Sequence, residues 1–315
     1  MSPTPDIDGV LVQWGDRLFY PGNRIVKTQP QPKLGTLAAR QRAAALRERI
    51  AATVVRRAPQ VMVKVTGGGR GMKAIAAHLR YISRGGRLEM EDERGQTMRG
   101  KDALRVLADD WRYGGSLIGD ESPRREAFNI MLSMPRGTDP LSVQWAAREF
   151  AKAELPDHKL IMVLHDHQAN PHVHISVRAE SKHGKRLNPR KTDLHRWRET
   201  FAAKLRERGI DAEASRQATR GVARNHPQLW QVKAAEQGRL LRPFRNSRGA
   251  AAAASRAEAQ CAWQGIGAAL ARSGDPSDRK LAAAIERFSR EIMPSGQREA
   301  PTPSRPPVPG VDRSR

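Results

Sequence analysis

The stretch "HKLIMVLHDHQANPHVHISVRAE", residues 158–180, predicts two β-strands joined by a short polar turn. Apolar and β-branched residues run up to the turn and away from it, and "QAN" followed by Pro171 is typical of an antiparallel hairpin. His172 and His174 are two residues apart on one predicted strand, so their side chains leave the same face. His165 ends the preceding strand, and the hairpin can bring it beside the other two.

Three imidazoles on one face of a sheet need an explanation beyond packing. Each is costly to bury without a partner, and protonated imidazoles repel one another. A divalent metal ion removes both costs, because it binds the neutral nitrogen lone pairs. We therefore predict a metal site at His165, His172 and His174, with a coordination position left open for a substrate. His167 lies in the predicted turn, where it either joins this site or faces solvent.

Strand and helix patterns surround the hairpin between residues 61 and 215. Valines at positions 61, 63 and 65 alternate with other residues, which predicts a strand. A second strand is expected at 126–134, and helices are expected at 72–84, 102–112, 140–155 and 193–208. This order predicts an α+β fold in which helices pack on one face of a sheet.

The charge balance divides the chain into three parts. The formal net charge is +23 and the pI is about 11.2, which favours a polyanionic partner such as nucleic acid. Residues 61–215 have the most ordinary balance, with 28 basic and 21 acidic residues. We predict a catalytic or binding domain at 61–215 between a basic extension at 1–60 and another at 216–315.

The two extensions have weaker patterns than the predicted domain. The first is predicted to be irregular to about residue 36 and then helical to about residue 57. In the second, short helices are expected at 227–240, 251–272 and 278–292, followed by a disordered Pro- and Arg-rich tail. The sequence contains no apolar run long enough to span a bilayer, so we expect no membrane span. A single cysteine, Cys261, excludes an internal disulfide bond and fits a cytoplasmic protein.

Three sequence motifs, in order, resemble those of conjugative relaxases. "VMVKVTGGGRGMKAIAAHLRYISRGGRLEM" at 61–90 resembles the first motif of the VirD-type (MobP-like) mobilisation nucleases, and "FNIMLSMPRGTDP" at 128–140 resembles the second. "NPHVH" at 170–174, with a further histidine upstream, resembles the third, histidine–hydrophobe–histidine motif. The segments that match cover about half of the chain, within residues 61–215.

This resemblance implies a five-stranded antiparallel sheet, a nucleophilic Tyr81, and Mg²⁺ or Mn²⁺ on the three histidines, where Zn²⁺ can also bind. It also implies nicking of one DNA strand at a transfer origin by transesterification, with a 5′-phosphotyrosyl adduct. Independently, Tyr81 lies about 120° away from the apolar stripe formed by Ile75, Leu79 and Ile82 on the predicted helix, so it is not an obvious core residue.

Residues around the metal motif are predicted to orient the imidazoles or to contact the DNA. Asp166 and His167 stand near the place where VirD-type members commonly have an aspartate, and Asn129 stands where many relaxases have a carboxylate, so these three are candidates to orient the imidazoles. Arg178 shares its strand face with His172 and is expected beside the metal. Backbone phosphates of single-stranded DNA are expected to contact Arg84, Arg178, Lys182, Lys185, Arg186, Arg190 and Lys191.

The sequence leaves other functions open. A rolling-circle replication initiator also uses histidines and a tyrosine, but in that class the tyrosine follows the histidines, whereas Tyr81 precedes them. A non-catalytic DNA-binding accessory protein or a metal-dependent hydrolase are further alternatives. For a relaxase the expected partners are single-stranded and supercoiled DNA at a transfer origin, accessory relaxosome proteins and a type IV secretion coupling protein. Such a protein works in the bacterial cytoplasm and can be translocated to the recipient cell with its DNA.

Overall fold

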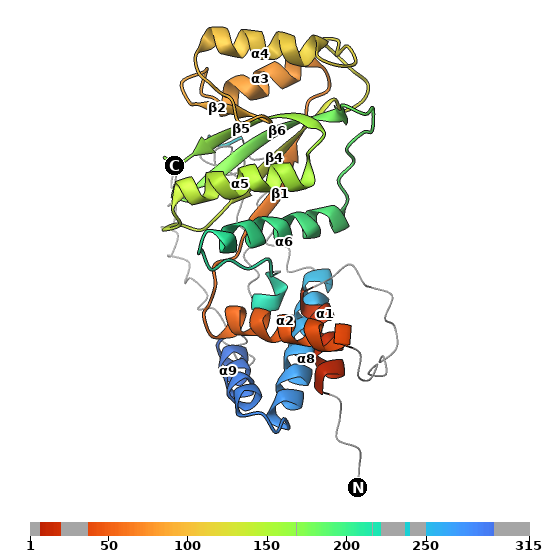
Figure 1. The fold of residues 1–315 in the computed structure, drawn as a ribbon, viewed down its shortest axis with the longest axis vertical. Helices are drawn as coiled ribbons and strands as arrows, with labels where there is room; N and C mark the ends of the chain where they lie inside the picture. The colour runs from red at the N-terminus through yellow and green to blue at the C-terminus, as the bar shows by residue number, and fades with distance from the viewer. Residues whose placement is uncertain are drawn as a thin grey trace, which may run out of the picture.

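The computed structural model describes residues 7–19, 37–167, 169–215, 217–221, 237–239 and 250–292. Figure 1 shows a layered part, in which a sheet lies between helices, and a bundle of helices next to it. The strands are β1 (Met62–Gly67), β2 (Met90–Asp92), β3 (Thr97–Met98), β4 (Ala127–Ser133), β5 (His158–His165) and β6 (His172–Ser181). The helices are α1 (Ile7–Phe19), α2 (Leu37–Val54), α3 (Met72–Ile82), α4 (Lys101–Tyr113), α5 (Pro140–Glu154), α6 (Lys191–Glu207), η1 (Ala218–Arg220), α8 (Ala250–Ala271) and α9 (Pro276–Ile292).

The sheet confirms the α+β class and the antiparallel pairing. Its strand order is β1-β4-β6-β5-β2-β3, and each neighbouring pair is antiparallel. It has six strands and not the five that the resemblance implied. The additional strand is the two-residue β3, which pairs with β2 across a turn that contains Gly95 in a left-handed conformation (φ 80°).

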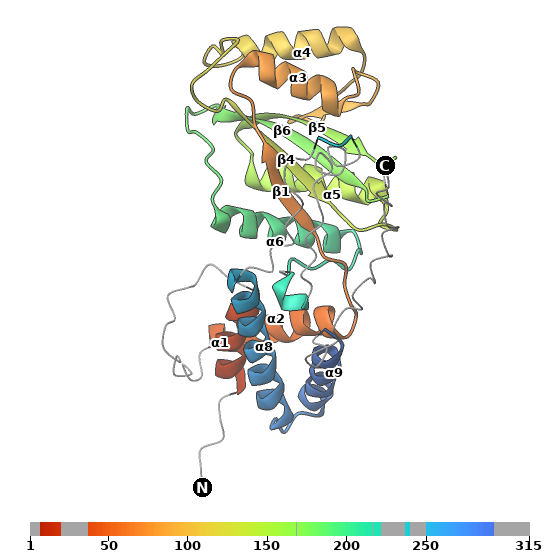
Figure 2. The same cartoon turned by 180° about the vertical axis from the view of Figure 1, so that it is seen from behind.

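Helices cover both faces of the sheet, so the prediction of helices on one face was wrong. α5 and α6 pack on the face that carries Leu160 and Met162, whereas α3 and α4 pack on the face that carries Ile161 and Val163. Figure 2 shows the same sandwich from behind. The physical reason is that β5 is apolar on both sides, and each side needs a helix layer to exclude water.

Helices from the two extensions share one core. Buried apolar side chains of α1, α2, α8 and α9, including Leu11, Leu46, Trp263 and Phe288, form a cluster separate from those of the sheet. The Trp263 indole N–H also donates to the carbonyl oxygen of Thr219 in η1 at 2.8 Å.

The extensions therefore differ from their sequence-based description. Residues 7–19 form a helix and are not irregular, because one side of α1 is buried against α2 and α8. The helices expected at 251–272 and 278–292 are confirmed as α8 and α9. The expected helix at 227–240 and the expected disordered tail after residue 292 fall outside the described residues, apart from residues 237–239. Over the described ranges, none of the helices has the length and hydropathy needed to cross a bilayer.

A nearly buried ion-pair group joins the helical bundle to the sheet part. Arg49 of α2 donates to Glu199 of α6 at 2.8 Å and to Glu213 at 2.6 Å. The Glu213 side chain is 3% exposed and that of Arg49 is 14% exposed. Burial raises the pKa of Glu199, although Arg49 acts in the opposite direction. Without Arg49, the carboxylates of Glu199 and Glu213 would lose the guanidinium that both of them contact.

We expect Arg49→Ala to lower the free energy of unfolding by about 3 kcal/mol, because it leaves the Glu213 carboxylate buried and unpaired. Arg56→Ala is the matched control, since Arg56 pairs with Glu48 and Asp211 at an exposed position and should cost less than about 1 kcal/mol. Denaturant unfolding monitored by circular dichroism measures both. Equal losses for the two variants would show that Arg49 does not couple the two parts.

Candidate active site

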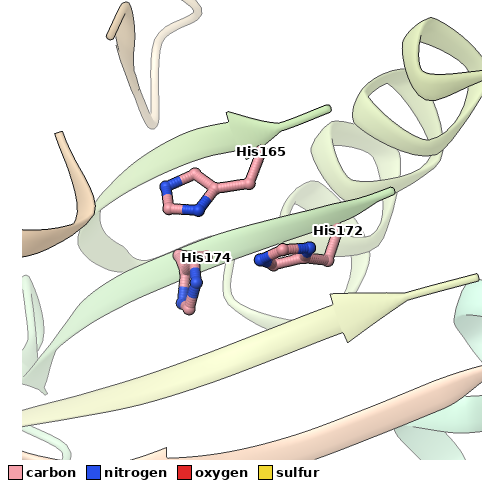
Figure 3. Close-up of side chains that lie close together, drawn as sticks. All are labelled: His165, His172 and His174. Atoms are coloured by element: carbon pink, nitrogen blue, oxygen red, sulfur yellow. The ribbon is translucent and has the colours of Figure 1, made fainter. Parts of the chain in front are cut away.

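The register of the β5–β6 hairpin places the three predicted metal ligands together. His165 pairs directly with His172, and His174 lies two residues further along β6 on the same face. The ring centroids are 4.7 Å apart for His165 and His174 and 5.0 Å apart for each of the other two pairs. One nitrogen from each ring lies within 4.8 Å of the others. Figure 3 shows the rings converging from the two neighbouring strands.

The environment of the cluster favours neutral imidazoles. Burial, followed by the nearby imidazoles His165, His172 and His78, lowers the pKa of His174 to about 3. Burial also lowers the pKa of His165. The Nδ1 atom of His174 is buried and has no hydrogen-bond partner in the described structure. Neutral rings are the form that binds a metal ion, so these shifts fit a metal site.

Backbone carbonyls orient two of the rings. The Nε2–H of His165 donates to the carbonyl oxygen of Ile82 at 2.7 Å, and the Nδ1–H of His172 donates to that of Asn170 at 2.9 Å. Because a carbonyl accepts hydrogen bonds only, these contacts fix the tautomers and leave His165 Nδ1 and His172 Nε2 with free lone pairs. The donor set, the burial and the fixed tautomers all fit a divalent cation.

Helix α3 brings Tyr81 to the edge of the cluster. Ile75, Leu79 and Ile82 are buried against the sheet, which turns Tyr81 outward, and its side chain is 71% exposed. His78 lies one turn earlier, with its ring centroid 6.3 Å from that of Tyr81 and 6.4 Å from that of His174. Tyr81, His78 and His174 therefore form a continuous row.

His78 was not among the site residues expected from the sequence. Its only signal was its position three residues before Tyr81, which places the two side chains on neighbouring parts of one helix. Burial lowers the pKa of His78, and its Nε2 atom is buried without a hydrogen-bond partner in the described structure. A buried ring nitrogen without a hydrogen-bond partner is costly, and His78 carries one beside an exposed tyrosine.

The candidates for orienting the imidazoles take different positions. His167 lies beside His165, with ring centroids 5.1 Å apart, and its Nε2 contacts the Arg84 guanidinium at the end of α3. Asp166 is exposed in the turn. The Asn129 side-chain oxygen accepts a hydrogen bond from Ser176 at 3.1 Å, two residues beyond His174 on β6. His167 is therefore in contact with a member of the three-histidine cluster, and its own partner is Arg84.

Arg178 is not positioned for the predicted contact with a DNA phosphate. It lies on the same face of β6 as the histidines, but its residue is only 3% exposed. Its guanidinium donates to the carbonyl oxygen of Trp111 in α4, at 2.7 Å, and to that of Ser116 in the segment that follows α4. The helix that covers this part of the sheet therefore buries Arg178 as a structural residue.

The basic loop after β6 is also displaced from the site. Lys182 follows Ser181, at the opposite end of β6 from His172. At about 3.3 Å per residue, roughly 25 Å separate the loop from the histidines. Lys182 pairs with Asp157 at 2.8 Å, and Arg186 pairs with Glu126 at 3.1 Å. The loop therefore lies at the far end of β6 from the three histidines, and the contact of Lys182, Lys185, Arg186, Arg190 and Lys191 with DNA phosphates stays a prediction.

Comparisons with known proteins match the part of the chain that carries the three histidines. A family profile described as "Relaxase: MobA/VirD2-like, nuclease domain" matches residues 96–210, which include the three histidines but not Tyr81. The T-DNA border endonuclease VirD2 of Rhizobium radiobacter is 26% identical over 184 residues, which is 52% of this chain and 43% of the relative. That of Agrobacterium fabrum is 25% identical over 185 residues, or 52% and 41% of the two chains.

The chain thus spans less than half the length of these two relatives. No solved structure matches it. The matched profile, the two relatives and the three converging histidines point the same way: the histidine-bearing part of the chain, residues 96–210, is similar to the nuclease domain of MobA/VirD2-like relaxases.

Proposed function

We propose that the protein nicks one DNA strand at a transfer origin of a plasmid or other mobile element and becomes covalently linked to the DNA through Tyr81. The observation that carries this proposal is the row in which an exposed Tyr81 meets His78, and His78 meets His174 of the three-histidine cluster. A nucleophile and a site that can stabilise phosphate charge thus lie on one edge of the domain. The description of the relatives as T-DNA border endonucleases supports strand cutting.

The proposed reaction is a transesterification. The phenol oxygen of Tyr81 bonds to the scissile phosphorus, and the bond between the phosphorus and the 3′ oxygen breaks. The phenol loses its proton and the 3′ oxygen gains one, so the products are a 5′-phosphotyrosyl link and a free 3′ hydroxyl. One phosphodiester replaces another, so the strand can later be rejoined by the reverse step.

His165, His172 and His174 would hold the divalent cation. When bound, this cation would draw negative charge from a non-bridging oxygen of the scissile phosphate. We propose Mg²⁺ or Mn²⁺ as the working ion, because the phosphate supplies hard oxygen ligands, although neutral imidazoles also suit Zn²⁺. The carbonyls of Ile82 and Asn170 hold two of the rings in the tautomers that this requires.

The biological setting is proposed from the same family. The substrate would be single-stranded or supercoiled DNA, and a net charge of +23 supports a polyanionic partner. Accessory relaxosome proteins and a type IV secretion coupling protein would be its protein partners. The protein would act in the bacterial cytoplasm and could enter the recipient cell with the DNA.

We predict that Tyr81→Phe forms no DNA adduct, because it keeps the ring but removes the attacking oxygen. The measurement uses single-stranded origin DNA labelled at its 3′ end, followed by denaturing electrophoresis. Wild-type protein should retain the labelled fragment. The matched control is Tyr113→Phe, since Tyr113 at the end of α4 is 67% exposed and should be dispensable. An adduct in Tyr81→Phe would show that the nucleophile is wrong, and a cleaved labelled fragment that migrates free of the wild-type protein would show that the polarity is wrong.

His172→Ala and His174→Ala are each expected to lower the rate of nicking at least about 100-fold, which is typical of losing one group that stabilises developing charge. Chelation of metal from the wild-type protein should have the same effect, and added Mn²⁺ should reverse it. Isothermal titration with Mn²⁺ should show weaker binding to both variants. Unchanged nicking after chelation would contradict the three-histidine site.

For His167→Ala we expect only a few-fold decrease in nicking, because His167 contacts His165 and Arg84 and is not one of the three converging ligands. Quantification of adduct over time, at saturating Mn²⁺, compares it with His172→Ala. A loss as large as that of His172→Ala would place His167 among the metal ligands.

A further inference from the structure

A basic groove lies between α3 and α4, on the outer side of the helix layer. Its volume is about 370 Å³. Three basic side chains and an apolar floor line it, and they include Arg80, Lys101, Arg105, Leu79, Leu104 and Ala108. The groove is distinct from the three-histidine cluster, none of whose members lines it.

The three cations in this groove lack acidic partners. In the described part of the chain, Arg80, Lys101 and Arg105 form no ion pair, and no acidic residue lines the groove. Other charges of α4 are paired: Arg112 binds Asp120, and Asp110 binds Lys159. Three like charges around one hollow repel one another, so an anionic ligand would stabilise them.

The groove lies on the side of α3 next to the side that carries Tyr81. Consecutive residues of a helix project about 100° apart, so Arg80 faces α4 while Tyr81 faces the side of His78. The helix surface between them is formed by Ala77, which lies one turn earlier and is exposed. The small methyl side chain of Ala77 leaves room for a DNA strand that crosses α3 from the side of Tyr81 to the side of Arg80.

We propose that this groove binds a backbone phosphate of the substrate strand, next to the nucleotide joined to Tyr81. The proposal rests on the proposed function. A DNA strand carries one negative charge per nucleotide, so a strand held at Tyr81 can cross Ala77 and place a neighbouring phosphate between Arg80, Lys101 and Arg105. Phosphate contacts position a strand without reading its sequence, so the groove would fix where the strand lies relative to the nucleophile. This site replaces the distant loop after β6 as the main anchor of the strand.

The test compares two charge-matched double variants of the full chain. Lys101→Gln with Arg105→Gln removes two charges from the groove. Lys185→Gln with Lys191→Gln removes two charges from exposed positions in and just after the loop that follows β6. Binding of a fluorescein-labelled oligothymidine of roughly twenty nucleotides is measured by anisotropy over a range of salt concentrations.

Loss of the groove charges should weaken binding at least about 10-fold and lower the slope of log K against log salt by about 0.7, since the groove holds one phosphate and each phosphate contact to a single strand contributes about 0.7. The control pair should bind within about 2-fold of wild type with an unchanged slope. Equal losses of oligothymidine binding in both variants would show that only net charge matters. A loss of binding in the control pair alone would show that the loop after β6, and not the groove, contacts the strand. Either result overturns the proposal.

A second readout separates this proposal from the nuclease function. With origin DNA, the groove variant should need more DNA for half-maximal adduct formation while keeping its maximal rate, because Tyr81 and the histidines are unchanged. If wild-type protein forms no adduct, the proposed nuclease function fails regardless of the groove. If wild-type protein forms adduct and the groove variant binds oligothymidine normally, the groove proposal alone fails. Arg80→Gln repeats both measurements if the double variant has a lower melting temperature.

Discussion

The pairing of His165 with His172 across the β5–β6 hairpin is the constraint on which the site depends. This register is not set by the histidines themselves. Val173 and Ile175 point to the opposite face, where they are fully buried against α5 and α6. A slip of one residue would expose those apolar side chains and move His174 to the wrong face. Hydrophobic burial on one side of β6 therefore fixes the position of the metal ligands on the other.

The nucleophile reaches the site by packing on that same face. α3 buries Ile75 and Leu79 against the sheet, and its last residue, Ile82, offers a carbonyl oxygen to His165. The backbone of α3 thus orients the predicted metal ligand His165, and the exposed side of the same helix carries Tyr81. Because both functions depend on one packed helix, a small shift of α3 would change the ring tautomer and the placement of the tyrosine together.

The large positive charge has two uses in this structure. Part of it stabilises the fold: Arg47 joins α2 to Asp8 of α1 and Asp278 of α9, and Arg178 is buried beneath the end of α4. Other cations, such as Lys101, have no acidic partner in the described residues and line a hollow. A net charge of +23 therefore indicates the class of partner but not the surface that binds it.

The sequence alone determined the hairpin, the face shared by His172 and His174, and the strands and helices between residues 61 and 208 other than the short β2 and β3, because period-two and period-3.6 patterns depend on near neighbours. It also singled out Tyr81 as lying off the apolar stripe. Only the tertiary structure decided that α1 packs with α8, that helices cover both faces, that His78 meets His174 and that Arg178 is buried. These contacts join residues far apart in the chain, and no local pattern records which distant side chain will fill the space beside a given residue.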